Sequence, residues 1–257
     1  MEIIVGKYSG FCSGVDYTYK KALEVVKQGK IYCLGEIIHN DLVIKELEDL
    51  GMVTVNKITD VPKNNKVIFR AHGEPIDSYL YAKENSIEVI DLTCGRVKAI
   101  HNIVEREKNN SFIVIIGKKT HPEIVGTVGF AGNNYFVIEN ENDIDLFYSK
   151  YKESKIDNIY IISQTTFSSS LFDLLAKKVI EKVGNKDIIT INKTICDATN
   201  KRQKECFDIS MRASLMLVLG GKNSSNTKEL YEIARKNCKR VIFIEKRWNE
   251  KLSATCI

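Results

Sequence analysis

The chain has no long apolar run, which limits where it can reside. No apolar stretch reaches the roughly 18 residues that a membrane-spanning helix needs. The N-terminus, Met1 to Val5, lacks the basic region and long apolar core of a secretory signal peptide. We therefore expect a protein without membrane association that stays in the cytoplasm, where thiols are kept reduced.

Proline is scarce, and linker-like composition is absent. The 257 residues include three prolines and no stretch rich in serine and glycine, so no hinge between domains is evident. The hydrophobic content of 44% is too high for a disordered chain. A chain of this length can bury one large core or two or three smaller ones.

Signatures of nucleotide and nucleic-acid binding are also missing. Neither a P-loop nor a GxGxxG fingerprint occurs, which argues against ATP and dinucleotides. The net charge is a modest +5, the basic residues are interspersed with acids, and aromatics are not interleaved with them. This argues against nucleic acid. Such a charge suits an anionic small molecule or an acidic protein partner.

Short apolar runs rich in Ile and Val alternate with amphipathic stretches along the chain. The apolar runs predict strands over residues 2–8, 30–35, 66–71, 87–93, 111–117, 134–139, 158–164, 187–195, 214–220 and 240–245. The amphipathic stretches predict helices over residues 14–28, 41–50, 76–85, 96–109, 122–131, 142–150, 168–183, 197–212 and 226–237. Repeated strand–turn–helix units with continuously apolar strands predict an α/β fold with mostly parallel sheets and right-handed crossovers.

Three of the seven cysteines share one structural position. Cys12, Cys94 and Cys196 each follow a predicted strand or apolar run and precede a predicted helix. Three thiolates can hold an iron–sulfur cubane and leave its fourth iron open for a substrate. Three ligands with an open position are also the arrangement of a catalytic metal site, such as that of a zinc hydrolase. No HExxH-like pair accompanies them, which weakens the zinc alternative.

Other cysteines and one histidine have simpler explanations. Any single cysteine is more often a small buried hydrophobe than a ligand. Cys33 lies in a predicted strand, and Cys206 and Cys238 fall on or next to predicted helices, so we interpret them as core residues. His101 lies in the middle of a predicted helix and is interpreted as a packing or surface residue.

Polar residues follow the predicted strands, where ligands bind in open parallel α/β sheets. The residues found there are His39, His72, His121, Glu123, Thr165, Thr166, Ser224, Ser225 and Asn226. Histidine, hydroxyl and amide side chains at helix N-termini, together with backbone N–H groups, form an anion-binding site. Each residue alone also fits a plain role as a helix cap or a first-turn acid, so the predicted site depends on their convergence.

These residues occur in motifs that resemble the LytB/IspH family. The motifs are Phe11-Cys12-Ser13-Gly14-Val15, Ile38-His39-Asn40, Arg70-Ala71-His72-Gly73, Thr93-Cys94, His121-Pro122-Glu123, Gln164-Thr165-Thr166, Ile195-Cys196-Asp197-Ala198-Thr199 and Lys222-Asn223-Ser224-Ser225-Asn226. They follow the family order from residue 5 to about residue 245. Members of the family are 4-hydroxy-3-methylbut-2-enyl diphosphate reductases, the last enzymes of the methylerythritol phosphate route to isoprenoids.

The resemblance implies a fold and a cofactor. The fold has three pseudo-related α/β units around a central cavity, which we expect over residues 1–96, 97–195 and 196–257. The cofactor is one 4Fe–4S cluster, which the resemblance places on Cys12, Cys94 and Cys196. A ferredoxin or flavodoxin is the implied electron donor, and donors of this kind are acidic.

The resemblance also implies roles in catalysis and substrate binding. The substrate diphosphate would be bound by His39, His72, His121, Ser224 and Asn226, with Ser225 helping from the same turn. Thr165 and Thr166 would also belong to the substrate-binding set. His121, Glu123 and Thr165 would act in catalysis, with Thr166 supporting them. The implied reaction removes an allylic hydroxyl with two electrons and protons, giving isopentenyl and dimethylallyl diphosphate. An open iron would act as the Lewis acid, and Glu123 would supply protons through Thr165.

The chain departs from the family pattern in three places. Gly95 stands where many members have proline, and Glu74 occupies a place that is usually apolar. We expect the Glu74 carboxylate to point outward. The family continues past residue 245 with a Thr-Ala-Gly-Ala-Ser type turn whose serine binds diphosphate, and no such turn occurs here. We therefore expect an incomplete third unit with weaker diphosphate binding. A non-catalytic protein that binds a cluster or a diphosphate is the alternative.

Overall fold

The fold consists of three α/β units, each with its own parallel sheet, in a computed structural model that describes residues 2–245. The first sheet has the order β2-β1-β3-β4. Its strands are β1 (Ile31–Leu34), β2 (Met52–Val55), β3 (Lys66–Phe69) and β4 (Glu88–Asp91). The helices of this unit are α1 (Ser13–Val26), α2 (Asp41–Asp49) and α3 (Ile76–Glu84), with the 3₁₀ turn η1 (Ile58–Asp60).

The second unit repeats the four-stranded parallel arrangement with the order β6-β5-β7-β8. Its strands are β5 (Phe112–Ile116), β6 (Tyr135–Ile138), β7 (Ile159–Ser163) and β8 (Ile189–Ile191). Its helical segments are α4 (Gly95–Glu107), α5 (Pro122–Val128), η2 (Glu141–Asp143), α6 (Ile144–Ser154) and α7 (Ser169–Val183). Every residue of β5 is buried, because helices cover both faces of this central strand.

The third unit is small. Within residues 2–245 it contains two parallel strands, β9 (Met216–Leu219) and β10 (Val241–Ile244). Its helices are α8 (Asp197–Ser210) and α9 (Ser225–Asn237). Val218 of β9, Cys206 of α8 and Ala234 of α9 form its buried core.

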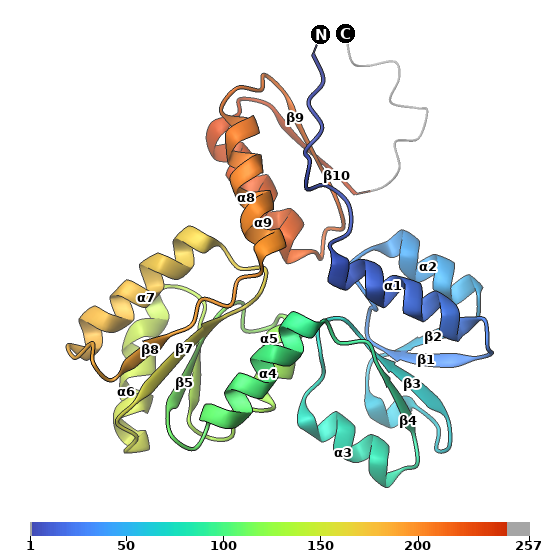
Figure 1. Cartoon of the computed structure of the whole chain (residues 1–257), viewed down its shortest axis with the longest axis horizontal. Coiled ribbons are helices and arrows are strands. Elements are labelled where there is room, and N and C mark those ends of the chain that lie inside the picture. The colour runs from blue at the N-terminus through green and yellow to red at the C-terminus, as the bar shows by residue number, and fades with distance from the viewer. Residues whose placement is uncertain (1, 246–257) are drawn as a thin grey trace.

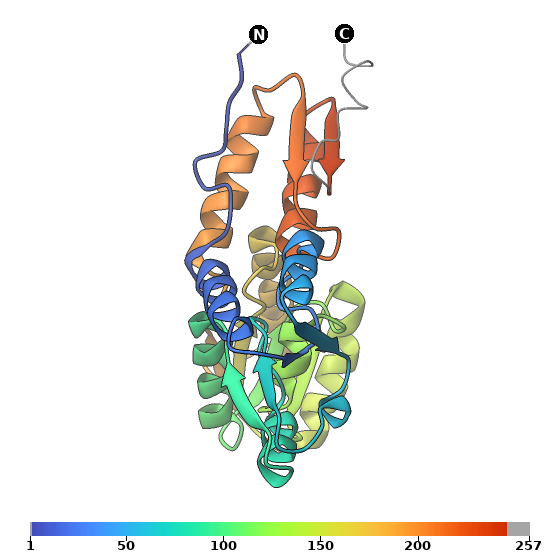
Figure 2. The same ribbon diagram turned by 90° about the vertical axis from the view of Figure 1, so that its right-hand side faces the viewer.

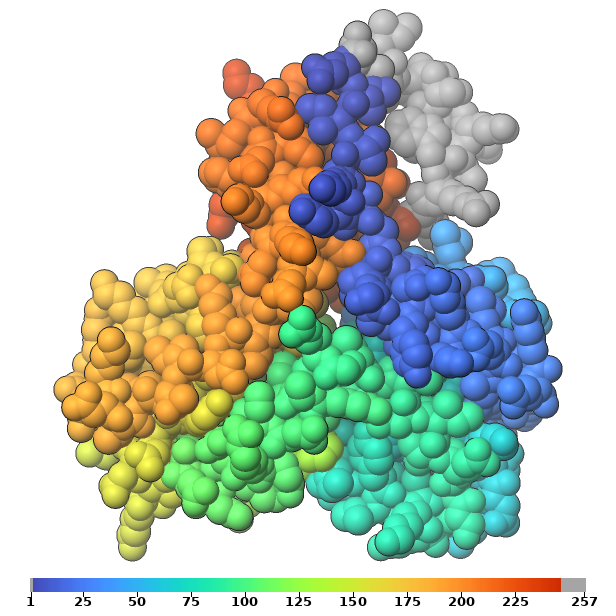
Figure 3. All heavy atoms as spheres, viewed as in Figure 1, coloured from blue at the N-terminus to red at the C-terminus, as the bar shows by residue number. Residues whose placement is uncertain are grey.

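The three units are arranged as lobes around a common junction. Figure 1 shows the third unit at the top, the first at the lower right and the second at the lower left. Figure 2 shows that the third unit extends away from the other two. In the space-filling view of Figure 3, the segments that carry α1, α4 and α8 meet at the centre. No helix in the described part of the chain is long and apolar enough to cross a membrane.

The predicted α/β class with parallel sheets is confirmed, but the predicted strand over residues 2–8 is wrong. Ile3 and Val5 are 75% and 77% exposed. The backbone N–H groups of Lys7 and Tyr8 instead donate to the carboxylate of Glu205 on α8, at 2.7 and 3.0 Å. A side chain of another unit therefore satisfies this backbone, where a neighbouring strand was expected.

Strand β2 was not predicted. It has four residues and pairs only with β1 at the edge of the first sheet. It comes directly after Gly51, whose φ of +110° permits the tight return from α2. The polar Thr54 follows the apolar pair Met52-Val53, so the segment offers no apolar run of four residues.

Two other expectations remain predictions. One is the set of unit bounds, 1–96, 97–195 and 196–257. The other is the lack of a diphosphate-binding turn after residue 245, with the incomplete third unit that it implies. Residues 246–257, on which this second expectation depends, lie outside the described residues.

Candidate active site

The three patterned cysteines occupy equivalent places in the three units. Cys12, Cys94 and Cys196 are the N-cap residues of α1, α4 and α8, the first helices of their units. All three are half-buried free thiols. Burial raises the pKa of the Cys94 thiol, and the nearby charges of Cys12 and Cys196 raise it further. The three thiols are therefore close enough to influence one another.

Close contacts hold the junction around these thiols together. A Cβ added to Gly14 would lie 2.6 Å from the Cys94 Sγ, so this position in α1 accepts only glycine without rearrangement. The guanidinium of Arg96, two residues after Cys94, lies 2.9 Å from the carboxylate of Asp197, which directly follows Cys196. The chain thus brings the N-terminal ends of α1, α4 and α8 together, as Figure 1 also shows.

The donor set fits an iron–sulfur cluster better than a single zinc ion. Backbone N–H groups of the helix ends face the sulfurs: those of Arg96 and Val97 lower the pKa of Cys94, and the N–H of Thr199 lies 3.4 Å from the Cys196 Sγ. Among residues 2–245, the three thiols do not form a group with all ligand atoms within 4.8 Å of one another. Sulfur ligands of one tetrahedral zinc lie about 3.8 Å apart, whereas a cubane carries each cysteine on a separate iron.

Three histidines form a second cluster at the ends of three strands. His39 follows β1, His72 follows β3, and His121 follows β5 as the N-cap of α5. The ring centroids of His39 and His72 are 4.4 Å apart, and His121 lies 5.8 and 5.5 Å from them. One ring nitrogen from each lies within 4.8 Å of the others.

Hydrogen bonding makes this cluster a better site for an anion than for a metal cation. The Nδ1 atom of His121 accepts a hydrogen bond from the Glu123 backbone N–H at 3.2 Å, so the neutral ring carries its proton on Nε2. An N–H group donates to an anion and does not bind a metal. Burial lowers the pKa of His121 to about 3, with smaller effects of His39 and nearby cationic side chains. Burial also lowers the pKa of His72 well below its ordinary value, aided by the other two histidines and Arg70. Both rings are therefore neutral hydrogen-bonding groups near pH 7.

Glu123 and Thr165 form a buried pair beside the histidines. Glu123 lies in the first turn of α5 and is 3% exposed. Its two carboxyl oxygens accept from the backbone N–H and the hydroxyl of Thr165, both at 2.6 Å. Burial raises the pKa of Glu123 to about 7, against the opposing effect of the two hydrogen bonds. The carboxyl group can therefore both give and receive a proton near neutral pH.

Backbone contacts connect the thiols to both polar groups. The N–H of Cys196 donates to the carbonyl of Thr165 at 3.0 Å. The N–H of Cys94 donates at 3.0 Å to the carbonyl of Ala71, which precedes His72. The thiols, the histidine cluster and the Glu123–Thr165 pair thus belong to one region of the molecule.

The predicted serine turn joins this region from the third unit. A Cβ added to Gly221 would lie 2.3 Å from the backbone oxygen of His39, so the turn packs directly on the histidine cluster. Ser224 is the N-cap of α9 and accepts from the Thr227 N–H at 3.2 Å. The Oδ1 atom of Asn226 is buried without a hydrogen-bond partner among the described residues. Such an atom is available to a ligand.

Two predicted substrate residues are less directly placed. The hydroxyl of Thr166 accepts from the side-chain amide of Gln164 at 2.9 Å. Ser225 is buried in the first turn of α9. No hydrogen bond within residues 2–245 joins either side chain to the histidines.

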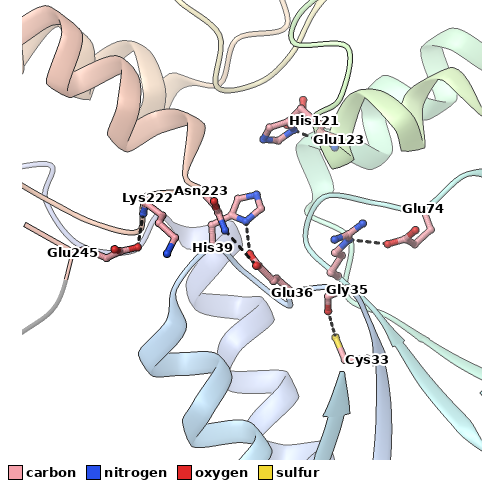
Figure 4. Close-up of polar contacts among 11 residues, drawn as sticks. Cys33, Gly35, Glu36, His39, Glu74, His121, Glu123, Lys222, Asn223 and Glu245 are labelled. Carbon is pink, nitrogen blue, oxygen red and sulfur yellow. Dashed lines mark hydrogen bonds and ion pairs between the residues drawn. The ribbon is translucent and has the colours of Figure 1, made fainter. Parts of the chain in front are cut away.

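The expectation that Glu74 points outward is wrong. Its side chain is 7% exposed and accepts from the Nε of Arg70 at 2.8 Å. Burial raises the pKa of Glu74, and the Arg70 guanidinium opposes this shift. The carboxylate is buried because the arginine beneath the histidine cluster neutralises it, and Figure 4 shows this contact on Glu74.

Sequence reasoning also missed Glu36, which lies 2.8 Å from the Nδ1 of His39. Its position three residues before a predicted ligand was the available signal. The packing interpretations hold: Cys33, Cys206, Cys238 and His101 are all buried. His101 stacks on Phe130 with ring centroids 4.4 Å apart.

Comparison with known proteins identifies the family to which the chain belongs. The family model described as LytB protein matches residues 3–254. The chain belongs to the LytB family. The 4-hydroxy-3-methylbut-2-enyl diphosphate reductase of Alkaliphilus oremlandii is 38% identical over 239 residues, which cover 91% of this chain and 82% of the relative. The protein of the same name from Petrotoga mobilis is 38% identical over 250 residues, covering 95% and 84%.

A solved structure agrees with this assignment. The E-1-hydroxy-2-methyl-but-2-enyl-4-diphosphate reductase from Plasmodium falciparum superposes with a TM-score of 0.83 at 31% identity, covering 92% of this chain and 74% of that one. LytB proteins are iron–sulfur reductases that act on a small diphosphate and need an electron donor. The half-buried thiols and the histidine cluster are the features of this LytB chain that match such an enzyme.

Proposed function

We propose that this LytB chain is a 4-hydroxy-3-methylbut-2-enyl diphosphate reductase, which forms isopentenyl and dimethylallyl diphosphate in the last step of the methylerythritol phosphate route. The observation that carries the proposal is the backbone connection of Cys196 to Thr165, whose hydroxyl in turn lies 2.6 Å from Glu123. This connection brings a candidate cluster ligand to a buried proton donor. A reductive loss of hydroxide needs both.

We propose that Cys12, Cys94 and Cys196 hold one 4Fe–4S cluster. When bound, the cluster supplies electrons and one open iron as a Lewis acid for the substrate hydroxyl. The backbone N–H groups at the three helix N-termini stabilise negative charge on the sulfurs.

The protein's own groups then bind the diphosphate and move protons. His121 donates through Nε2–H, and His39, His72, Ser224 and Asn226 complete the diphosphate site. Ser225 and Thr166 support it from neighbouring positions. The allylic C–O bond breaks, the oxygen leaves as water with one added proton, and a second proton joins one of two carbons. Two electrons from an external donor balance the step.

Glu123 is the source of the first proton in this proposal. With a pKa of about 7, it is protonated in roughly half of the molecules at neutral pH. The Thr165 hydroxyl carries the proton toward the substrate oxygen, since it already touches the carboxyl group at 2.6 Å. A ferredoxin or flavodoxin of the cytoplasm is the proposed donor, and its acidic surface is complementary to the net charge of +5.

The test is anaerobic turnover with a chemical reductant. Cluster-loaded protein is mixed with the allylic diphosphate, dithionite and a viologen dye, and both five-carbon diphosphates are measured. We expect a brown protein with a broad absorption near roughly 400 nm from thiolate-to-iron charge transfer, and formation of both products. A fully loaded sample without product would contradict the proposal and favour a non-catalytic binding protein. A colourless zinc protein would contradict it too.

A further inference from the structure

Glu36 contacts two parts of the proposed diphosphate site at once. One carboxylate oxygen lies 2.8 Å from the Nδ1 of His39, and the other lies 3.4 Å from the side-chain amide nitrogen of Asn223. Figure 4 shows both contacts on the same carboxylate. Glu36 follows β1 in the first unit, whereas Asn223 belongs to the serine turn of the third. This carboxylate therefore bridges two units at the histidine cluster.

The contact with Glu36 determines which nitrogen of His39 carries the proton. A carboxylate accepts only, so the Nδ1 of His39 is the donor in this pair. The neutral ring then has a lone pair on Nε2, which is buried without a partner among the described residues. A lone pair repels a phosphate oxygen. His39 can donate to a diphosphate through Nε2 only when a second proton has been added.

His121 has the opposite tautomer to His39, and this contrast defines the role of His39. The Nε2 of neutral His121 already carries hydrogen, because its Nδ1 accepts from the Glu123 N–H. His121 can thus bind an anion without gaining charge. Two neighbouring imidazoles with opposite tautomers mean that only one of them has to change its protonation when the ligand arrives.

Titratable and charged groups surround His39 on several neighbouring elements. His72 and His121 pack against its ring, at 4.4 and 5.8 Å between centroids, and both are neutral near pH 7. The charge of Arg70 acts on both of these rings, and those of Lys118 and Lys228 act on His121. Arg70 is itself paired with Glu74. Glu36 is the carboxylate in direct contact with His39, and the diphosphate would be the second anion.

We propose that Glu36 is a positioning residue for the diphosphate: it orients His39 so that a proton enters this ring together with the ligand. This inference rests on the proposed function, because it assumes that the anion is the substrate diphosphate. In the bound state, the protonated His39 ring lies between the Glu36 carboxylate and a phosphate group of the ligand, and both ring nitrogens donate to anionic oxygens. The proton comes from solvent, and no other bond forms or breaks.

The second oxygen of Glu36 aligns the serine turn with His39. Asn223 directly precedes Ser224, the N-cap of α9. The backbone at Gly221 already lies against the His39 carbonyl, where an added Cβ would be 2.3 Å away. The side-chain contact and the backbone contact together fix the turn against the cluster. Loss of Glu36 should therefore weaken binding through both units.

The test measures the protons taken up when a diphosphate binds. Inorganic diphosphate is titrated calorimetrically into cluster-loaded protein at pH 7.5, in buffers with different ionisation enthalpies. We expect Glu36→Gln to take up about one proton fewer than wild type, because the neutral amide no longer stabilises the His39 imidazolium. Affinity should fall roughly tenfold with the loss of a charge-assisted hydrogen bond. The proton balance of the ligand itself is the same for both proteins and cancels.

Matched variants separate positioning from a merely structural role. Glu46→Gln is the control, since the exposed Glu46 accepts from the Tyr19 hydroxyl at 2.9 Å in the same unit and should bind diphosphate like wild type. Asn223→Ala should lower affinity with proton uptake unchanged. Equal proton uptake in wild type and Glu36→Gln would overturn the proposal. If Glu36→Gln loses its cluster, Glu36→Asp is compared with His39→Gln instead. Glu36→Asp should take up the extra proton on binding diphosphate, and His39→Gln should not. Equal proton uptake by these two variants would also overturn the proposal.

Turnover distinguishes this proposal from the proposed function. In the viologen assay, Glu36→Gln should raise KM for the allylic diphosphate about tenfold with a smaller change in kcat. Wild-type protein that turns over without the Glu36-dependent proton contradicts the role of Glu36 alone. Protein that binds diphosphate with this proton but forms no product contradicts the reductase proposal alone.

Discussion

Glu123 shows how burial of one carboxyl group creates a proton donor. Its pKa of about 7 results from desolvation in a site where, among residues 2–245, Thr165 alone offers it hydrogen bonds. The same burial disfavours the folded state whenever the group is ionised. Function and stability are therefore in conflict at this residue.

Replacement of Glu123 by glutamine should separate these two effects. The variant lacks the proton donor, so turnover should fall roughly 10²- to 10⁴-fold. Because the folded-state pKa is raised from 4.5 to about 7, folding favours the protonated acid, and the stability it contributes below pH 4.5 is lost as pH rises to 7. Above pH 7 the cost is up to about 3 kcal/mol, which glutamine avoids. Denaturant unfolding at pH 5 and pH 8 measures this difference.

A conservative change in the partner provides the control. Thr165→Ser keeps the hydroxyl that contacts Glu123 and should retain most of the turnover, whereas Thr165→Val should resemble Glu123→Gln. If the stability gain of Glu123→Gln were the same at pH 5 and pH 8, the carboxyl group would not titrate as its burial implies.

For single residues, the sequence predicts where the functional side chains lie in the fold better than it predicts which side chains they contact. The thiols and histidines were recognisable because they follow apolar runs, and the chain direction of a parallel sheet places such residues at one edge. The contacts of Glu36 with His39 and of Arg70 with Glu74 depend on side-chain direction and on packing between distant turns. The pattern of apolar and polar residues along the sequence carries no information on side-chain direction or on packing between distant turns.

Helix α5 lies close to a neighbouring turn because two glycines at the contact have no side chains. It carries His121 at its N-cap and Glu123 in its first turn. Added Cβ atoms at Gly126 and Gly129 would lie 3.0 Å from the backbone oxygen of Gly73 and 2.4 Å from the Cβ of Pro75. The helix therefore lies directly against the turn that holds His72, and two glycines permit that approach.

A methyl group at this contact should disturb both stability and binding. We expect Gly129→Ala to lower the free energy of unfolding by about 1–3 kcal/mol through overpacking and to raise KM for the diphosphate, since α5 would shift from the 72–75 turn. Gly95→Ala is the matched control, because within residues 2–245 its added Cβ at the start of α4 would meet no heavy atom within 4 Å outside its own helix backbone and chain neighbours. It should match wild type or gain stability. Denaturant titration and KM measurements check both; equal behaviour of the two variants would contradict this packing role.

The elements differ in how well periodicity predicted them. The fully buried β5 has five consecutive apolar residues and is unmistakable. The segment over residues 2–8 has three consecutive apolar residues and also suggests a strand, but it contacts the side chains of α8. Local composition cannot tell a strand with neighbours from an extended segment without them, because pairing is a property of the fold.

The whole molecule distributes one candidate cofactor site over three units. Cys12, Cys94 and Cys196 each begin the first helix of a unit, so a cluster bound by all three would connect the units. Each unit has its own small core, and the third is the smallest. Cofactor binding should therefore contribute to the stability of the assembly as well as to catalysis.

Removal of one thiol tests this connection. Cys94→Ser should lose iron and sulfide and lower the thermal midpoint of cluster-loaded protein by roughly 5–10 °C. Cys206→Ser is the control, since Cys206 is buried in the core of the third unit, its thiol contacts the Leu230 carbonyl, and its pKa is raised to about 11 by burial. Metal analysis and thermal unfolding check both variants. Full iron content in Cys94→Ser would contradict the ligand assignment.

The contact between the N-terminal segment and α8 determines the order in which the site can be built. Arg202 binds the carbonyls of Tyr8 and Gly10 at 2.8 and 2.7 Å, and Glu205 binds the backbone just before them. These residues lead directly to Cys12, so the first cysteine to leave the ribosome is oriented by residues made almost two hundred positions later. A nascent chain without α8 has two complete sheets but no fixed place for Cys12. We therefore expect a cofactor held by Cys12, Cys94 and Cys196 to be inserted only after α8 has been made, even though the early units can fold during synthesis.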